Sequence, residues 1–177
     1  MDKDIRMALD SFGDVWSRVE KQHKAKPNVK KHVRGPGSAP RPESKGDTQA
    51  KHISKFLEAE ARQVSFYTSL AKRCQGRFRA VLMRIASDEK RHFTLLHTEY
   101  FLLTGECRTL SAPTPVINGV LSALRQAYEH ENAASESYAR AAAEADNDRL
   151  RSLYSTLSAE EAGHAREIRR LIEASMR

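Results

Sequence analysis

The sequence contains two copies of one arrangement of residue types that can hold metal ions. In each copy a glutamate is followed seven residues later by a tyrosine, and then by a Glu-x-x-His motif. The first glutamate precedes this motif by 29 residues in one copy and by 30 in the other. The residues are Glu60, Tyr67, Glu89 and His92 in the first copy, and Glu131, Tyr138, Glu161 and His164 in the second. The matching spacings indicate two equivalent structural units.

Helical spacing places each of these glutamates on an apolar face. Apolar residues recur around them at intervals of three or four, which is the pattern of a helix that packs against other helices. The four stripes are Ile53, Phe56, Glu60, Val64 and Tyr67; Phe78, Leu82, Ile85, Glu89, His92 and Leu96; Leu121, Leu124, Glu131, Ser135 and Tyr138; and Leu150, Leu153, Leu157, Glu161, His164, Ile168 and Leu171. The glutamate lies near the middle of each stripe, so we expect four carboxylates to meet at the centre of a bundle.

Four carboxylates in one core repel one another, and burying even one unpaired charge costs several kcal/mol. Protons could neutralise them, and two divalent metal ions would balance their four charges. Residues at i and i+3 lie side by side on a helix, so each Glu-x-x-His motif can hold one metal. Glu60 and Glu131 would supply further oxygens as terminal or bridging ligands. Mixed carboxylate and imidazole ligation suits iron or manganese, with zinc as an alternative, and this combination on four helices is typical of di-iron carboxylate proteins.

Other titratable residues are interpreted from their lack of a matching partner. Tyr67 and Tyr138 are expected beside the site, donating hydrogen bonds to metal-bound carboxylates, although core packing explains them nearly as well. Three histidines are interpreted as surface residues or as residues behind the ligands: His52, His97 and His130. Glu99 and Glu167 are interpreted as solvated.

From Asp47 onward the chain has a helical pattern with short interruptions. Asp47 or Thr48 is predicted to cap the first helix and Gly76 to end it. The later helices are predicted from about Arg77 to Thr104, from after Pro115 to about Ala145, and from the turn at residues 146–148 nearly to Arg177. No alternation typical of strands occurs in this stretch, so the predicted fold class is all-α, a four-helix bundle.

The lengths of the connections predict the topology. The first and third connections are a few residues long, which makes each flanking pair of helices an antiparallel hairpin. The middle connection, Gly105 to about Pro115, can stretch about 36 Å, close to the roughly 39 Å length of a helix of about 26 residues. One long crossover between two hairpins predicts the ferritin-like arrangement rather than a plain up-down-up-down bundle.

The first 46 residues differ from the rest, which divides the chain into 1–22, 23–46 and the bundle at 47–177. Residues 23–46 hold seven basic residues and one acid, together with four prolines and the glycines Gly35 and Gly37, and are predicted to be a disordered linker. Residues 1–22 carry an apolar stripe around Trp16 that is typical of a short amphipathic helix, which needs a surface on which to dock. That surface could belong to its own bundle, to a sister subunit or to another protein, and a membrane surface is the least favoured alternative.

The net charge of +7 is largely a property of the linker, which alone carries +6. We therefore do not expect nucleic acid as a partner. A weaker alternative is that the basic linker binds nucleic acid electrostatically. No apolar run is long enough to span a membrane, and the first residues lack a secretory signal. Cys74 and Cys107 are too few for a disulfide scaffold, a zinc ribbon or a rubredoxin-type iron site. We expect a reducing, cytoplasmic setting.

Residues from about 50 to 175 resemble the ferritin-like superfamily, specifically its rubrerythrin-type di-iron proteins. The likeness is carried by Glu60-Ala61 through Phe66-Tyr67-x-x-Leu70-Ala71 and by Ile85-Ala86-x-Asp88-Glu89-x-x-His92. It implies a centre of two iron ions per chain, with manganese or mixed metals as alternatives, held by Glu60, Glu89, His92, Glu131, Glu161 and His164. The further glutamate that rubrerythrins place on the third helix is not matched, because Glu129 lies some 200° around the helix from Glu131.

The resemblance implies an oxidoreductase that reduces hydrogen peroxide or oxidises ferrous iron. The rubredoxin-like domain of full rubrerythrins is missing from the sequence, so peroxide reduction would draw electrons from a separate protein. The alternative is an iron-binding and iron-handling protein, with or without ferroxidase activity, that residues 1–22 tether to a protein partner. Bundles of this type usually pair, so we expect a homodimer.

Overall fold

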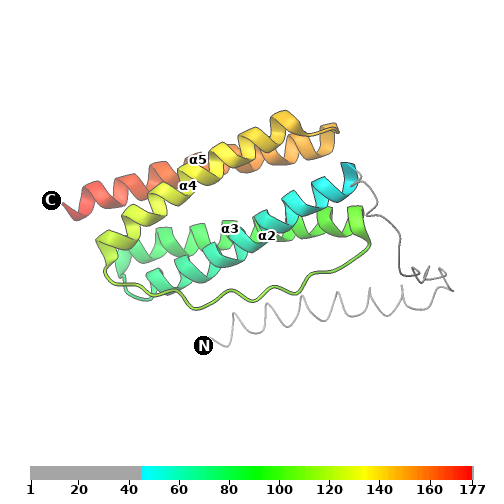
Figure 1. The fold of residues 1–177 in the computed structure, drawn as a ribbon. Helices are drawn as coiled ribbons and strands as arrows, with labels where there is room; N and C mark the ends of the chain where they lie inside the picture. Colours follow the sequence, from blue (N-terminus) through cyan, green and yellow to red (C-terminus); the bar gives the residue numbers. More distant parts are fainter. Residues whose placement is uncertain (1–44, 177) are drawn as a thin grey trace. The chain divides into compact units, whose positions relative to one another are not determined.

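The computed structural model describes residues 45–176, which form four long helices packed side by side (Figure 1). They are α2 (Lys45–Ala71), α3 (Gly76–Thr104), α4 (Val120–Glu144) and α5 (Asp148–Ser175). No strand occurs among the described residues, so the predicted all-α four-helix bundle is confirmed. The predictions for residues 1–22 and 23–44 lie outside the described residues.

The first helix begins slightly before its predicted start. Lys45 and Gly46 belong to α2 rather than to the linker, and neither Asp47 nor Thr48 is its first residue. The last proline before the helix is Pro42. No proline occurs within Lys45–Ala71, so no missing amide hydrogen interrupts α2 along its length.

Each of the two hairpins closes through a short turn. In the first, the amides of Arg73 and Cys74 donate to the carbonyl oxygens of Leu70 and Ala71 at 2.9 and 3.2 Å. Gly76 has a φ of 53°, a left-handed conformation that glycine adopts without a Cβ penalty, and it begins α3 instead of ending α2 as predicted. The second hairpin turns at residues 145–147.

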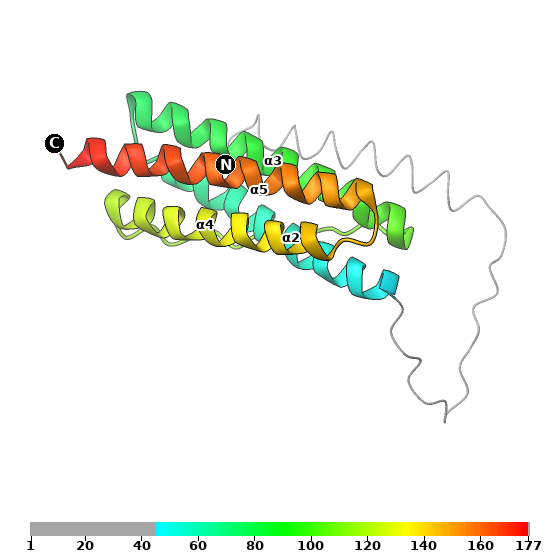
Figure 2. The ribbon, with the colours of Figure 1, turned by 90° about the horizontal axis from the view of Figure 1, so that it is seen from above.

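The crossover between the hairpins covers residues 105–119 and runs along the length of the bundle (Figures 1 and 2). It starts where Gly105, with a φ of 71°, ends α3 by donating its amide to Phe101 at 2.7 Å. The third helix begins at Val120, later than predicted. The reason is that Ile117 is buried in the core and its carbonyl oxygen accepts a hydrogen bond from Arg73 at 2.6 Å. The long crossover confirms the ferritin-like arrangement.

Two apolar clusters fill the bundle, one toward each end. Leu70, Leu82, Ile85, Leu124 and Ile168 belong to the first, and Ile53, Leu57, Leu96, Leu150 and Leu157 to the second. The glutamates of the four stripes lie between these clusters, as their positions in the sequence predict. None of the described helices is long and apolar enough to cross a membrane.

Candidate metal centre

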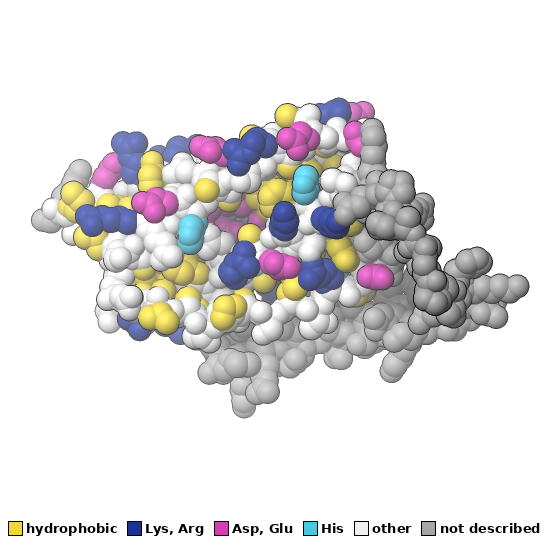
Figure 3. All heavy atoms as spheres, viewed as in Figure 1, with side chains coloured by type: hydrophobic (Ala, Val, Ile, Leu, Met, Phe, Trp, Pro, Cys, Tyr) yellow, Lys and Arg dark blue, Asp and Glu magenta, His cyan; other side chains and the backbone are white. Residues whose placement is uncertain are grey.

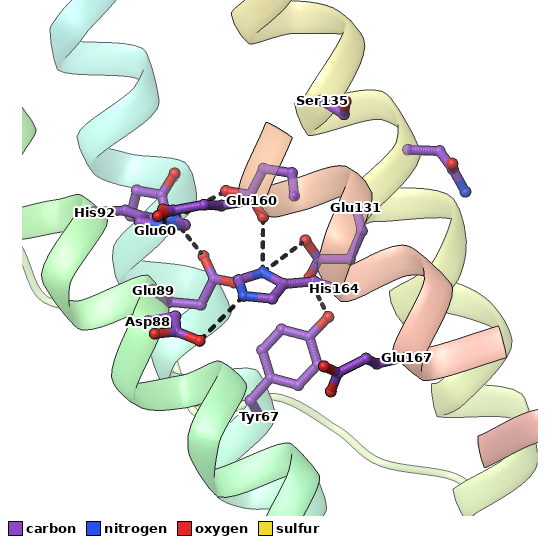
Figure 4. A network of polar contacts seen from close by, with 12 residues as sticks. Glu60, Tyr67, Asp88, Glu89, His92, Glu131, Ser135, Glu160, His164 and Glu167 are labelled. Atoms are coloured by element: carbon purple, nitrogen blue, oxygen red, sulfur yellow. Dashed lines mark hydrogen bonds and ion pairs between the residues drawn. The ribbon is translucent and has the colours of Figure 1, made fainter. Parts of the chain in front are cut away.

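The six predicted ligands meet at the centre of the bundle. Each of the four helices contributes a glutamate, and α3 and α5 each add a histidine from the next turn of the helix (Figure 4). All six side chains are buried, with at most 4% of any residue exposed: Glu60, Glu89, His92, Glu131, Glu161 and His164. The structure therefore brings together every residue of the predicted ligand set.

These residues form two overlapping groups that can each surround one metal ion. Glu60 and His92 belong to the first group only, and Glu131 and His164 belong to the second group only. Glu89 and Glu161 belong to both groups. Within each group the ligand atoms all lie within 4.8 Å of one another. The sequence left open which glutamates would bridge, and the geometry favours Glu89 and Glu161 as the bridging pair, with the other two as terminal ligands.

Both histidines turn the same ring nitrogen toward the carboxylates. His92 Nδ1 lies 3.0 Å from an oxygen of Glu161 and 3.6 Å from one of Glu89. His164 Nδ1 lies 3.1 Å from an oxygen of each of the same two glutamates. The two histidines therefore stand in equivalent positions around the shared pair.

The opposite ring nitrogen of each histidine faces a carboxylate of the other hairpin. His92 Nε2 lies 2.7 Å from Glu160 Oε2, and His164 Nε2 lies 3.3 Å from Asp88 Oδ2 (Figure 4). An imidazole that donates its Nε2–H in this way presents the Nδ1 lone pair to a metal in a fixed orientation. Arg91 contacts Glu160 at 2.8 Å and Arg84 contacts Asp88 at 3.1 Å, so both acids are held in place in turn.

Asp88 and Glu160 were not singled out as functional by the sequence reasoning. A signal was present, since each immediately precedes the glutamate of a Glu-x-x-His motif. Helical phase alone places them on the edge of the apolar stripe, about 100° from the ligand, and does not show that they reach a histidine on another helix.

The two tyrosines connect the hairpins in the same reciprocal manner. The hydroxyl of Tyr67 on α2 donates to Glu131 Oε1 on α4, and that of Tyr138 on α4 donates to Glu60 Oε1 on α2. Each terminal glutamate therefore has one oxygen fixed by a tyrosine, with its other oxygen left for a metal. Both hydroxyl groups therefore lie beside candidate ligands.

Comparison with known proteins agrees with this geometry. The sequence profile described as rubrerythrin matches residues 51–172, which is well over half of the chain. The chain belongs to the rubrerythrin family. A solved structure of a hypothetical protein from Pyrococcus furiosus superposes with a TM-score of 0.63 at 22% identity, covering 70% of this chain and 87% of that one. At that identity the likeness shows the fold alone, and no curated protein matches the sequence.

In this rubrerythrin domain the metal-free cluster balances its charges with protons. Burial raises the pKa of Glu60 well above its usual value and that of Glu131 to about 9, although contacts with the histidines oppose this. Burial also raises the pKa of Glu89 and Glu161, but the close approach of the histidine rings lowers it by more, to below its usual value. These directions favour the neutral form of Glu60 and Glu131 and the ionised form of Glu89 and Glu161.

The histidines supply the compensating positive charge. Burial lowers the pKa of His164, but its contacts with three glutamates outweigh burial and raise it to about 12. Burial likewise lowers the pKa of His92, but its contacts with Glu161, Glu60 and Glu89 raise it well above its usual value. Two imidazolium ions and two carboxylates leave the cluster with no net charge.

The residues present fit a pair of divalent metal ions. Four buried ligand atoms make no hydrogen bond within the described part of the chain: Glu60 Oε2, Glu89 Oε1, His92 Nδ1 and Glu161 Oε1. Buried polar atoms are rarely left without hydrogen bonds, so such a convergent set points to a cation as the missing partner. Four carboxylates and two imidazoles are a donor set suited to iron or manganese.

Among the described residues, the other histidines and acids belong to neither of the two ligand groups. His97 is buried, contrary to its interpretation as a surface residue or a residue behind the ligands, because its Nε2 accepts the amide of Arg108 at 3.2 Å and anchors the crossover. Glu99, interpreted as solvated, is only 9% exposed and pairs with Arg149 at 2.7 Å. His52, His130 and Glu129 are exposed, and Glu167 is partly exposed and pairs with Arg84.

A cavity of about 460 Å³ leads from the surface to the four glutamates. Side chains of α2 and α4 line it together with Pro113 and Pro115 of the crossover, and neither ligand histidine is among the lining residues. Figure 3 shows acidic side chains at the bottom of a hollow on this face of the molecule. The metal ligands are thus approached from the side of the terminal glutamates.

Proposed function

We propose that this protein is a di-iron oxidoreductase whose two ferrous ions react with hydrogen peroxide or with dioxygen. The observation that carries the proposal is the pair of four-residue groups that share Glu89 and Glu161, because two common carboxylates would hold two ions near one another, where both could act on one small oxidant. Membership of the rubrerythrin family supports the same class of reaction.

A ferrous pair held by the six ligands would supply the two electrons that, with two protons, reduce one hydrogen peroxide to two water molecules. The protein's own part is to fix the ligands and control access. Tyr67 and Tyr138 hold one oxygen of each terminal glutamate, while Asp88 and Glu160 orient the histidine rings. The apolar clusters above and below the ligands exclude bulk water, so reactants enter through the cavity between α2 and α4.

Repeated turnover with peroxide needs an external reductant. The two cysteines of this sequence cannot provide the four thiolates of a rubredoxin-type iron site. A separate electron-donor protein is therefore part of the proposal when peroxide is the oxidant.

The test is anaerobic loading with Fe(II), followed by separate stopped-flow challenges with peroxide and with air-saturated buffer. We expect two Fe(II) ions to bind per chain and one peroxide to be consumed for every two ions oxidised. The reaction with the oxidant that is not the substrate should be much slower. Oxidation followed by retention of both ions supports a catalytic centre. Release of Fe(III) to the buffer after each oxidation would instead support iron handling by ferroxidation, with iron as the substrate.

Glu89→Ala is the matched negative variant, and Glu129→Ala is its control on an exposed surface position. Equal oxidation rates in Glu89→Ala and in the parent protein would refute the assignment of the reaction to this cluster.

A further inference from the structure

The cavity above the terminal glutamates is larger than the proposed oxidants require. Its volume is about 460 Å³, whereas one water molecule takes up about 30 Å³ of liquid. Peroxide and dioxygen each have two heavy atoms, so either would fill only a small fraction of this space. Volumes between about 300 and 1,000 Å³ are typical of sites that bind organic molecules.

The walls of this cavity are apolar and firmly held. Phe56 and Phe66 lie on α2, and the Phe56 ring packs against that of Tyr138 with centroids 4.4 Å apart. On the crossover, Pro113 is fixed by a hydrogen bond of 3.3 Å from the Ser65 hydroxyl to its carbonyl oxygen. Ala134 on α4 leaves space between these walls. An apolar body with several carbon atoms can therefore displace water here without ordering flexible side chains.

The rim of the cavity carries positive charge. Lys55 and Arg62 line it from α2, two helical turns apart, and are therefore on the same face of that helix. Both side chains are exposed, and within the described part of the chain neither forms an ion pair. Most arginines around the metal centre differ in this respect, as Arg84 and Arg91 show by their contacts with acids. The rim thus has two cations that no acid of the described residues neutralises.

The floor of the cavity does not repel an anion. Its four glutamates are balanced by two divalent ions when the centre is loaded, and the lining contains no other acid. An anionic group is therefore favoured at the rim by two cations, and an apolar group is favoured along the walls.

We propose that this cavity binds an amphipathic organic anion, specifically a carboxylate with a short hydrocarbon chain. Its carboxylate pairs with Lys55 and Arg62, and its hydrocarbon chain extends between Phe56 and Phe66 toward the metal centre. The inference deepens the proposed function, because the chain of such a ligand would end beside the ions that react with the oxidant. It concerns binding, and it can be tested without turnover.

The probe is octanoate, titrated by calorimetry into the full-length protein loaded with Mn(II). We expect saturable binding of one octanoate per chain and at least tenfold weaker binding of octan-1-ol, which has the same chain without the charge. A Lys55→Ala, Arg62→Ala double variant should weaken octanoate binding at least tenfold. Its matched control is Lys72→Ala, Arg125→Ala, which removes two exposed cations that do not line the cavity.

A second variant tests the hydrocarbon path. Ala134→Leu places a larger side chain in the cavity and should abolish octanoate binding, whereas Ala139→Leu on the exposed face of the same helix should not. Circular dichroism and the Mn(II) content of each variant show whether it has folded. Octanoate binding that survives both the charge and the volume variants would overturn the proposal.

The orientation of the ligand is measured by nuclear magnetic resonance. Bound Mn(II) broadens nearby resonances, so the methyl end of octanoate should broaden more than the methylene group beside its carboxylate. The opposite order would show that the carboxylate itself ligates the metal, which contradicts the placement at the rim. If octanoate does not bind but Fe(II) is still oxidised, only this inference is overturned. If octanoate binds but the protein holds no metal pair, only the proposed function is refuted.

Discussion

Filling the centre with two divalent ions should release about four protons per chain. In the metal-free protein burial keeps Glu60 and Glu131 protonated, with the pKa of Glu131 raised to about 9. Contacts with the glutamates keep His92 and His164 protonated, with the pKa of His164 raised to about 12. All four groups must lose a proton before they can ligate a metal, so the metal ions replace these protons charge for charge.

The magnitude follows from the number of protons. Each proton contributes about 1.36 kcal/mol per pH unit, so four protons change the combined binding free energy by about 5.4 kcal/mol per unit. The metal-free state holds more protons than the loaded state, so affinity rises as pH rises. Anaerobic titration with Mn(II) in weakly buffered solution, with base added to hold the pH near 7, counts the protons directly.

A variant makes the count specific. Glu131→Gln has no carboxyl proton to lose and should release about three protons, whereas the exposed Glu129→Gln should still release about four. Release of one proton or none by the parent protein would show that the metal-free glutamates are ionised, and the charge balance derived from the structure would be wrong.

Further predictions concern the ligands, their partners and the N-terminal segment. Glu89→Ala should lose both ions, because Glu89 belongs to both ligand groups, whereas Glu60→Ala should lose only one, because Glu60 belongs to one group. Elemental analysis after metal loading measures this, and the control Glu129→Ala should keep two ions. Asp88→Asn should keep both ions at saturation but bind them about 10- to 100-fold more weakly in a competition assay with a chelator. Loading should raise the melting temperature by an amount that grows with free metal concentration, and a constant melting temperature would contradict binding to the folded state. Deleting residues 1–44 should leave metal content and turnover unchanged, since every ligand lies in the described bundle, and an empty centre would show that the segment belongs to the folded domain.

The sequence predicted the bundle and the convergence of the six candidate ligands because both depend on periodicity. A glutamate such as Glu60 in the middle of an apolar stripe has only one direction to face once the helix packs. The repeat then shows that four such residues meet, because the two hairpins are equivalent. This reasoning needs no knowledge of how closely the helices approach one another.

What the sequence did not predict depends on distances between helices. The distance between α3 and α5 decides which glutamates belong to both ligand groups. The residue pattern of a single helix does not contain that distance. The reach of Glu160 to His92 and the burial of His97 under the crossover have the same origin. The Glu99–Arg149 pair is a further case, since an acid on a helix edge is solvated only until a basic residue of another helix approaches it.

The sharing of Glu89 and Glu161 has a mechanical consequence. These residues come from different hairpins, so an ion bound to both is a cross-link between segments that lie roughly 70 residues apart in the chain. By the chain-entropy estimate used for covalent links, closing a loop of that size would destabilise the unfolded chain by about 4 kcal/mol. The metal pair would then be a non-covalent cross-link between hairpins that no disulfide joins. Separation of the hairpins and release of the metal would be coupled. Removal of the metal would remove this cross-link, so the two hairpins could then separate more easily.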